Sequence, residues 1–346
     1  MTSGDIRELA RDCGFELAGV AAAEPAADRG RFHEWTAAGY AGEMRYLTDR
    51  RAAVRDDPRN LLPSAKSIIC AGKLYNTPPP SVREVTSGQA WISRYAWGDD
   101  YHDDLRRRLE RLDALLREGA AVHFESRICV DTAPLLERSY ARLAGLGWIG
   151  KNTCLINEPL GSWFFLGELL VSLAIKPDLP PPDRCGTCTR CIDACPTAAI
   201  VPAPAGYAID SRLCISYFTI ELRGAVPEEL QPGMGQHVFG CDICQDVCPW
   251  NRRAPATGDP AYQPRHFAPP LEDLAEITEE QFREMFRGTP VTRARYSGFL
   301  RNVAIAMGNA GLPQFRAPLE RLADSPDAGV AAHARAALRR LLTLTS

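Results

Sequence analysis

The longest regular pattern of apolar and polar residues covers residues 101–117, where leucine recurs at the spacing of one helical face. Leu105, Leu109, Leu112 and Leu116 form that face, with charged residues between them. Further helical patterns cover residues 6–13 and 134–144, and short β-like runs cover residues 67–71, 121–125 and 164–175. Because strands and helices alternate, the pattern predicts an α/β layer structure for this N-terminal part.

Two proline-rich stretches interrupt the pattern, the first at residues 177–182 and the second at residues 254–270. Proline continues neither a helix nor a central strand. We therefore predict a multidomain chain with domains at residues 1–176, 177–253 and 254–346. The last domain carries helical patterns at residues 279–286, 293–309, 313–323 and 329–342, and we predict all-α, HEAT-like repeats there.

Composition places the chain among ordinary globular proteins. Hydrophobic residues make up 45% of the 346 residues and charged residues 24%. The net charge of −3 does not indicate a polyanionic partner, so any nucleic-acid contact must use local basic patches. The longest apolar run, residues 163–175, is too short for a membrane span and is broken by Glu168. The amphipathic N-terminal residues do not resemble an export signal, so we expect a cytoplasmic protein without membrane contact.

Cysteines supply the strongest chemical signal. Eight of the 12 cysteines lie between residues 185 and 248. Cys185-x-x-Cys188-x-x-Cys191-x-x-x-Cys195-Pro196 has the spacing of bacterial ferredoxins, in which the fourth cysteine binds the second of two [4Fe–4S] clusters. An incomplete run follows, Cys241-x-x-Cys244-x-x-x-Cys248-Pro249, and Cys214 is the remaining cysteine nearby. The region is therefore predicted to be a ferredoxin-like domain.

Crossed ligation then completes two sets of four ligands. The first set is Cys185, Cys188, Cys191 and Cys248, and the second is Cys195, Cys214, Cys241 and Cys244. Paired zinc sites are the structural alternative, since CxxC pairs also bind zinc, but zinc requires neither the complete run nor the crossing. The four scattered cysteines, Cys13, Cys70, Cys129 and Cys154, are predicted to be buried core residues.

Two further sequence patterns resemble known binding motifs but lack part of each motif. Gly145-x-Gly147-x-x-Gly150 follows a predicted helix rather than a strand, and Asn152 stands where a P-loop needs serine or threonine, so neither nucleotide motif is present. We expect another backbone segment or a flat cofactor to approach these glycines closely instead. Asp100-Tyr101-His102 approaches the cobalt-ligating motif of some cobalamin proteins but has Leu105 in place of its glycine.

Five blocks together resemble the epoxyqueuosine reductase family. They are ISRYAWGDDYH (92–102), VDTAPLLER (130–138), GWIGKN (147–152), CISYFTIE (214–221) and GCDICQDVCPWN (240–251). The resemblance covers nearly the whole chain. It implies a cobalamin held without a protein ligand to cobalt, two [4Fe–4S] clusters, and a tRNA substrate with epoxyqueuosine at the wobble position. The implied reaction is a two-electron reductive deoxygenation that yields queuosine and water.

The same resemblance suggests functional residues. Opening the epoxide leaves an alkoxide that a positioned acid must protonate, and Asp131 is our candidate, with a pKa raised by burial beside the corrin. A helix N-cap is the structural alternative for an aspartate before Thr-x-Pro. Predicted cobalamin contacts are Arg55, Tyr95, Asp131, Asn152, Ser216, Asp242 and Ile243. Predicted tRNA contacts are Arg293, Arg295 and Arg301, with Arg335, Arg339 and Arg340 as further phosphate partners.

Two other functions remain as alternatives. One is a corrinoid iron–sulfur reductase of a small molecule, similar to a reductive dehalogenase, and the other is an electron-transfer protein without a substrate. The large N-terminal domain and the block around Asp131 favour an enzyme. For the enzyme, we expect a monomer that takes electrons from an external donor, either a flavodoxin- or ferredoxin-type protein or a reductase.

Overall fold

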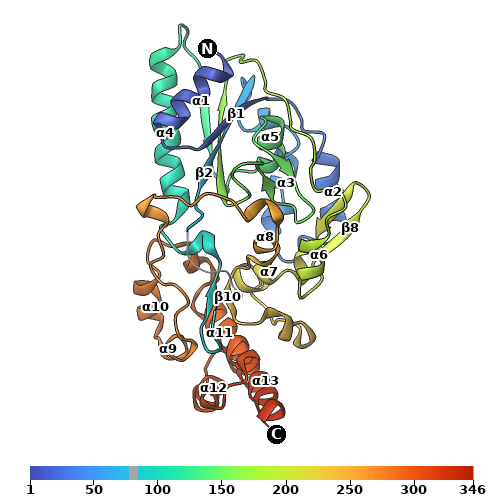
Figure 1. Ribbon diagram of the computed structural model, residues 1–346, viewed down its shortest axis with the longest axis vertical. Coiled ribbons are helices and arrows are strands. Elements are labelled where there is room, and N and C mark those ends of the chain that lie inside the picture. Colours follow the sequence, from blue (N-terminus) through green and yellow to red (C-terminus); the bar gives the residue numbers. More distant parts are fainter. Residues whose placement is uncertain (78–84, 346) are drawn as a thin grey trace.

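The structure is a computed structural model that describes residues 1–77 and 85–345 (Figure 1). Its N-terminal part is built on a four-stranded sheet in which every neighbouring pair is antiparallel. The strands, in spatial order, are β1 (Leu17–Ala22), β2 (Ser67–Leu74), β7 (Phe164–Val171) and β4 (Ser126–Cys129).

Helices cover both faces of this sheet, as Figure 1 shows. Helices α1 (Ser3–Asp12) and α4 (Tyr101–Gly119) pack on one face, and α5 (Glu137–Leu143) packs on the other. The predicted leucine face of α4 is confirmed, since all four leucines are fully buried against the sheet. The α/β layer prediction therefore holds at the level of layers.

One predicted strand and the predicted start of one helix differ from the structure. The strand expected at residues 121–125 is wrong, because this segment is irregular and β4 begins at Ser126. Ser126 pairs with Val171, the last residue of β7, so the preceding residues extend past the end of their partner strand. The helix expected from residue 134 begins only at Glu137, because residues 131–135 form a series of bends.

The cysteine-rich region contains little regular structure. Its elements are α6 (Arg190–Ala194), the hairpin β8 (Ile200–Ala203) and β9 (Gly206–Ile209), α7 (Ile215–Ile220), β10 (His237–Phe239) and α8 (Ile243–Asp246). Short elements elsewhere are α2 (Arg29–Ala37), α3 (Arg51–Val54), β3 (Trp91–Ile92), β5 (Trp148–Ile149) and β6 (Leu155–Ile156).

The C-terminal part is helical, as expected. Its helices are α9 (Leu271–Glu276), α10 (Glu279–Met285), α11 (Tyr296–Ala310), α12 (Arg316–Ala323) and α13 (Ala328–Thr345). Gly311, with φ +65°, ends α11 in the left-handed conformation that favours glycine. Whether these helices form HEAT-like repeats stays a prediction. Among the described residues, no helix has the length and apolar character needed to cross a bilayer.

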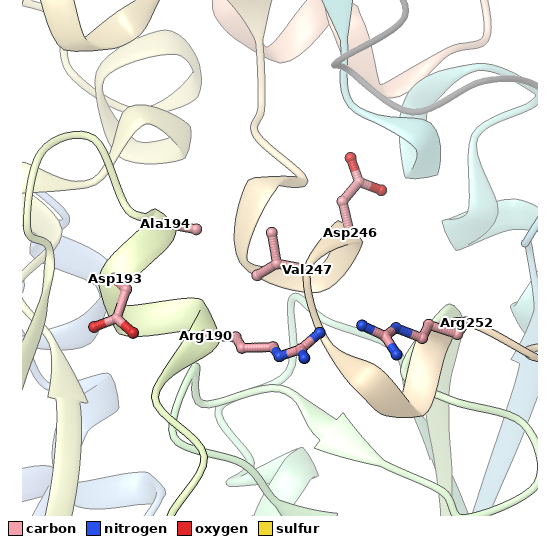
Figure 2. Close-up of a pocket in the computed structure, with 6 residues that line it drawn as sticks. All are labelled: Arg190, Asp193, Ala194, Asp246, Val247 and Arg252. Carbon is pink, nitrogen blue, oxygen red and sulfur yellow. The ribbon is translucent and has the colours of Figure 1, made fainter.

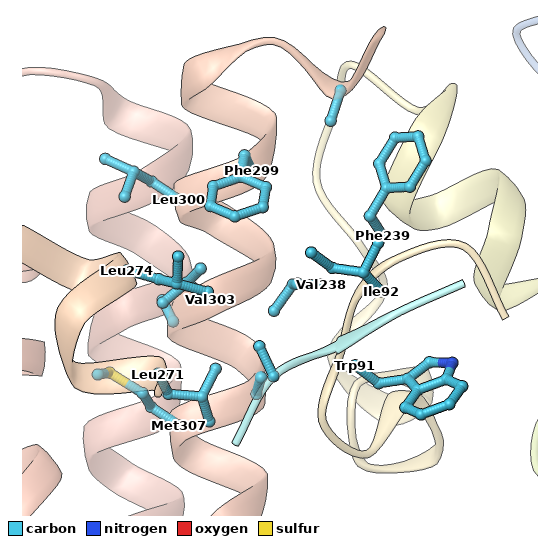
Figure 3. Close-up of a cluster of buried hydrophobic side chains, with 14 of the residues drawn as sticks. Trp91, Ile92, Val238, Phe239, Leu271, Leu274, Phe299, Leu300, Val303 and Met307 are labelled. Carbon is cyan, nitrogen blue, oxygen red and sulfur yellow. The ribbon is translucent and has the colours of Figure 1, made fainter. Parts of the chain in front are cut away.

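These helices share one core with two strands from earlier in the chain. Strands β3 and β10 pair in parallel, and Figure 3 shows their residues Trp91, Ile92, Val238 and Phe239 beside the apolar face of α11. Residues from the N-terminal, cysteine-rich and C-terminal parts therefore bury one another, and the C-terminal helices are fixed to the rest of the chain.

Candidate active site

The eight clustered cysteines lie at the ends of short helices and on the loops between them. Cys185 and Cys188 precede α6, Cys191 lies within it and Cys195 ends it, while Cys214 precedes α7. Cys241 and Cys244 flank the start of α8, and Cys248 follows that helix. Because α6 and α8 pack together, the two cysteine runs are brought to one place.

Electrostatic contacts link the thiols within each predicted set. Burial, and then the neighbouring Cys185 and Cys248, raise the pKa of Cys191 to about 11. In the second set, burial and the proximity of Cys214 and Cys195 raise the pKa of Cys241. Within the described residues, no three side chains converge as ligands of one metal ion. The electrostatic contacts group the thiols as the two predicted sets, and the assignment of each set to a cluster stays a prediction.

The glycine-rich loop at residues 145–152 supports the first cysteine run. Lys151 Nζ donates hydrogen bonds to the carbonyl oxygens of Gly186 and Cys188, at 2.8 and 2.9 Å. Gly147 allows the expected close backbone approach, since a Cβ there would lie 2.2 Å from the carbonyl oxygen of Ile156. The loop is therefore a support for the cysteines.

One prediction about the scattered cysteines is wrong. Cys13, Cys70 and Cys129 are buried as expected, but Cys154 is only half-buried and its thiol contacts that of Cys244. The nearby Asn152 side chain donates to the carbonyl oxygen of Cys244 and accepts from the backbone N–H of Cys154, both at 3.3 Å. Cys154 is thus a neighbour of the second set, which its isolated position in the sequence could not reveal.

Asp131 lies in the bends that follow β4, and His102 reaches it from the first turn of α4. His102 Nε2 is 3.1 Å from Asp131 Oδ2, and His102 Nδ1 is 2.6 Å from Asp100 Oδ1. Asp100 caps α4 by accepting from the backbone N–H of His102. The His102 ring stacks on Tyr101, which stacks on Phe165 of β7. These contacts fix the imidazole between two carboxylates.

The charges at this site follow from the pairing of His102 with the two carboxylates. Desolvation alone would lower the pKa of His102, but hydrogen bonds with Asp100 and Asp131 outweigh it and raise the pKa to about 9. Desolvation pushes the pKa of Asp131 upward, yet the hydrogen bond from His102 and the charges of His102 and Arg293 hold it below its usual value. In the protein without the corrin, a cationic partner therefore lowers the pKa of Asp131, and the raised pKa expected beside the corrin stays a prediction.

The N-cap alternative for Asp131 is wrong. Helix α5 begins at Glu137, six residues further on, and Leu136 occupies its N-cap. Asp131 instead adopts φ +48°, in the left-handed region that non-glycine residues seldom occupy. Its side chain is 46% exposed. Strained backbone conformations concentrate at functional sites, so this geometry supports a chemical role.

Arg293 joins this site from the C-terminal part. Its Nε donates to Glu221 Oε1 at 2.7 Å, and its guanidinium lies 5.8 Å from the centre of the Tyr46 ring. Desolvation first, and then Glu221, raise the pKa of Tyr46 to about 12, so Tyr46 stays neutral. All three parts of the chain therefore contribute side chains around Asp131.

Sequence analysis missed His102, Glu137 and Glu168 as site residues. Glu137 Oε1 accepts a hydrogen bond of 2.6 Å from the backbone N–H of Asp131. Glu168 is fully buried in β7 beside Glu137. The sequence signal for this pair was a carboxylate in the middle of an apolar run, at residue 168.

The predicted cobalamin contacts divide by exposure. Arg55, Asn152 and Asp242 are buried and make hydrogen bonds within the protein, and their contact with cobalamin stays a prediction. Arg55 donates to the carbonyl oxygens of Tyr46 and Arg51, and Asp242 accepts from Ser93 Oγ and from the backbone N–H of Arg94. Tyr95, Ser216 and Ile243 are half-buried and accessible, and Asp131 is exposed.

The predicted tRNA contacts also divide. Arg301 is 4% exposed and donates to the carbonyl oxygens of Phe218, Leu222 and Gly224, so its assignment to tRNA is wrong. Arg293 and Arg295 are exposed, at the start of the α11 segment. Of the further arginines, Arg335 and Arg339 are exposed, and Arg340 is half-buried and donates to Gln231.

Comparisons of the amino-acid sequence place this chain in a family. Residues 55–132 match the model described as "Epoxyqueuosine reductase QueG, DUF1730", and residues 184–251 match "4Fe-4S double cluster binding domain". An epoxyqueuosine reductase of Pseudomonas aeruginosa is 42% identical over 344 residues, covering 97% of this chain and 93% of the relative. The Escherichia coli enzyme is 39% identical, covering 88% of this chain and 80% of the relative.

Solved structures agree with the sequence comparisons. An epoxyqueuosine reductase crystallised with an epoxyqueuosine-modified tRNA-Tyr stem loop superposes with a TM-score of 0.89 and 28% identity, covering 98% of this chain and 89% of that one. A Bacillus subtilis epoxyqueuosine reductase superposes with a TM-score of 0.78 and 26% identity, covering 97% and 98%, and its catalytic aspartate loop is swung out of the active site. The chain therefore belongs to the epoxyqueuosine reductase family of oxidoreductases.

Proposed function

We propose that this protein reduces epoxyqueuosine at the wobble position of tRNA to queuosine. The observation that carries the proposal is Asp131, exposed in a strained loop and hydrogen-bonded to a charged histidine, beside a double-cluster region. The reaction removes the epoxide oxygen as water and needs two electrons and two protons. The structure offers candidates for delivering both.

Electron supply is assigned to the cysteine-rich region. We assign one [4Fe–4S] cluster to Cys185, Cys188, Cys191 and Cys248, and the other to Cys195, Cys214, Cys241 and Cys244. A pocket of about 460 Å³ opens beside these loops, lined by Arg190, Asp193, Ala194, Asp246, Val247 and Arg252. Figure 2 shows the side chains of Arg190 and Arg252 extending toward each other across it. Because Arg190 adjoins Cys191 in the chain, this is the proposed approach for an external electron donor.

A cobalamin fits the residues around Asp131 in part. Tyr95, Ser216 and Ile243 are accessible and would border it, whereas His102 uses both ring nitrogens within the protein and is not free to ligate cobalt. This agrees with a cobalamin held without a protein ligand. When bound, cobalamin supplies a metal centre that gathers single electrons from the clusters and delivers them as a pair.

Proton supply is assigned to Asp131 and His102 together. In the protein alone, the proton of this pair resides on His102, because its pKa is about 9 while that of Asp131 is lowered. Substrate that covers Asp131 would displace water and favour the neutral acid. His102 Nε2–H then passes its proton to Asp131 Oδ2, and Asp131 protonates the departing oxygen, which supplies the first of the two protons; the second comes from solvent.

Binding of tRNA is assigned to the face where Arg293 and Arg295 are exposed. Both lie close in sequence, and Arg293 is near enough to Asp131 to affect its pKa. Phosphate contacts made there would hold the anticodon loop beside the catalytic loop. Because such contacts release counterions, affinity for tRNA should fall steeply as salt is raised.

The test is an anaerobic turnover assay with protein reconstituted with iron, sulfide and cobalamin. An anticodon stem loop that carries epoxyqueuosine is the substrate, and nucleoside mass spectrometry measures queuosine. Conversion that depends on both cofactors supports the proposal. No conversion, with reduction of a small organohalide instead, would assign the site to the corrinoid reductase alternative.

A further inference from the structure

Glu168 is a carboxylate in the centre of the sheet. Along β7, Phe165 and Leu169 face α4, while Glu168 and Leu170 face α5. Its partners in register are Cys70 on β2 and Cys129 on β4, and its exposed fraction is 0%. A leucine would fill this position at lower cost, because a buried acid must be neutralised or paired. The carboxyl group therefore calls for an explanation beyond packing.

Glu137, the first residue of α5, lies between Glu168 and the Asp131 loop. The Glu137 and Glu168 carboxyl groups are close enough for a hydrogen bond between them. Among the described residues, no N–H or O–H donor reaches either Glu168 oxygen, so a proton shared with Glu137 is the hydrogen bond left to this carboxyl group. On its other side, Glu137 Oε1 accepts from the backbone N–H of Asp131 at 2.6 Å. The three acidic residues therefore form a line from the centre of the sheet to the site.

The Asp131 backbone needs such support. Its φ of +48° is strained for a residue with a Cβ, and a conformation of this kind persists only when surrounding contacts hold it. The contact with Glu137 ties that strained residue to α5. In the Bacillus subtilis relative a catalytic aspartate loop is swung out of the active site, so a loop of this kind can leave its place in that enzyme.

We propose that Glu137 and Glu168 are positioning residues, a proton-sharing carboxyl pair that holds the Asp131 loop in place and presents Asp131 to His102. The proposal rests on the proposed function for its catalytic consequence, but the loop contact itself does not. Glu168 donates its carboxyl proton to Glu137, and Glu137 accepts from Asp131. The pair thereby anchors the Asp131 loop to the sheet.

The electrostatic surroundings favour a shared proton. Burial, and then the negative charge of Asp131, raise the pKa of Glu137, and burial with Glu137 raises that of Glu168. Two carboxyl groups in one apolar site do not both ionise. The other titratable or charged groups that act on the pair are Arg138 on α5, Cys70, Cys129, Tyr101 and Arg55. Arg138 is exposed and only partly offsets the burial, so the pair keeps at least one proton at neutral pH.

Hydrogen exchange measured by mass spectrometry tests the loop contact without turnover. In the reconstituted protein, Glu137→Leu should accelerate exchange in the peptide that contains residues 131–136, whereas Glu137→Gln, which keeps an acceptor oxygen, should not. Glu110→Leu, at an exposed position on α4, is the matched control. Unchanged exchange in Glu137→Leu would overturn the proposal, whatever the substrate of the enzyme.

Kinetics test the consequence for catalysis. Glu137→Leu should lower kcat by on the order of 10²-fold with little change in KM for tRNA, because a misplaced catalytic group loses turnover rather than binding. Glu168→Leu removes a buried acid, so it should raise Tm while lowering kcat. A Glu168→Leu enzyme with parental kcat would show that Glu168 does not position the loop. If the parent itself fails to convert epoxyqueuosine, the exchange result still decides the loop contact.

Discussion

His102 Nε2 lies 3.1 Å from Asp131 Oδ2, while the other nitrogen of the same ring lies 2.6 Å from Asp100. The imidazole thus spans two carboxylates and carries a positive charge at neutral pH. The pairing links one end of α4 to the loop after β4, so the charge at the site depends on how these two elements are packed.

This pairing predicts how the protein responds to alkaline pH. The pKa of His102 is raised from 6.5 to about 9, so its stabilising effect is complete below pH 6.5 and is lost as the pH rises through 9. We expect kcat/KM to decline near pH 9, and His102→Gln to lose this alkaline limb. Kinetics measured from pH 6 to 10 check it. A parental alkaline limb in His102→Gln would assign the transition to another group.

Asp131→Asn should remove proton donation and leave the shape of the side chain. General acid catalysis typically raises the reaction rate by about 10²–10⁴-fold, so turnover of modified tRNA should fall by at least about 10²-fold. Single-turnover rates measure the loss, with iron and cobalamin contents matched to the parent. Near-parental conversion would leave Asp131 without a catalytic role.

The cysteine sets predict close to eight iron atoms per chain, from two four-iron clusters. Cys214→Ala should remove one cluster and preserve the other. Cys154→Ser is the matched control, because Cys154 contacts Cys244 but belongs to neither set. Iron analysis and electron paramagnetic resonance of the reduced proteins distinguish them. If Cys214→Ala keeps both clusters, the ligand assignment fails.

Two arginines of the C-terminal part should respond in opposite ways. Arg301→Met leaves buried carbonyl oxygens without a donor, at about 1–3 kcal/mol each, so Tm should fall. Arg295→Glu, at an exposed position, should preserve Tm and weaken tRNA binding, with a shallower salt dependence. Calorimetry and fluorescence anisotropy with the stem loop measure both effects. Parental affinity in Arg295→Glu would place the tRNA on another face.

The features that were predicted correctly depend only on residues that lie close together in the sequence. The leucines of α4 and the cysteine spacings follow from the periodicity of a helix and the reach of a loop. Arg301 could not be interpreted correctly, because an arginine that donates to backbone carbonyl groups of another segment looks in sequence like one on a surface. The same holds for Cys154, since its contact with Cys244 joins segments far apart in the chain. The lowered pKa of Asp131 likewise depends on His102, which folding brings beside it.

The core that β3, β10 and α11 share has a consequence for synthesis on the ribosome. Trp91 is translated early and Phe239 much later, but the helix that buries them is among the last segments to emerge. A nascent chain therefore exposes both aromatic side chains until α11 is complete, which is when aggregation and recruitment of chaperones are most favourable. A premature stop codon before α11 would for the same reason disable the catalytic loop and the cysteine loops, although it deletes none of their residues.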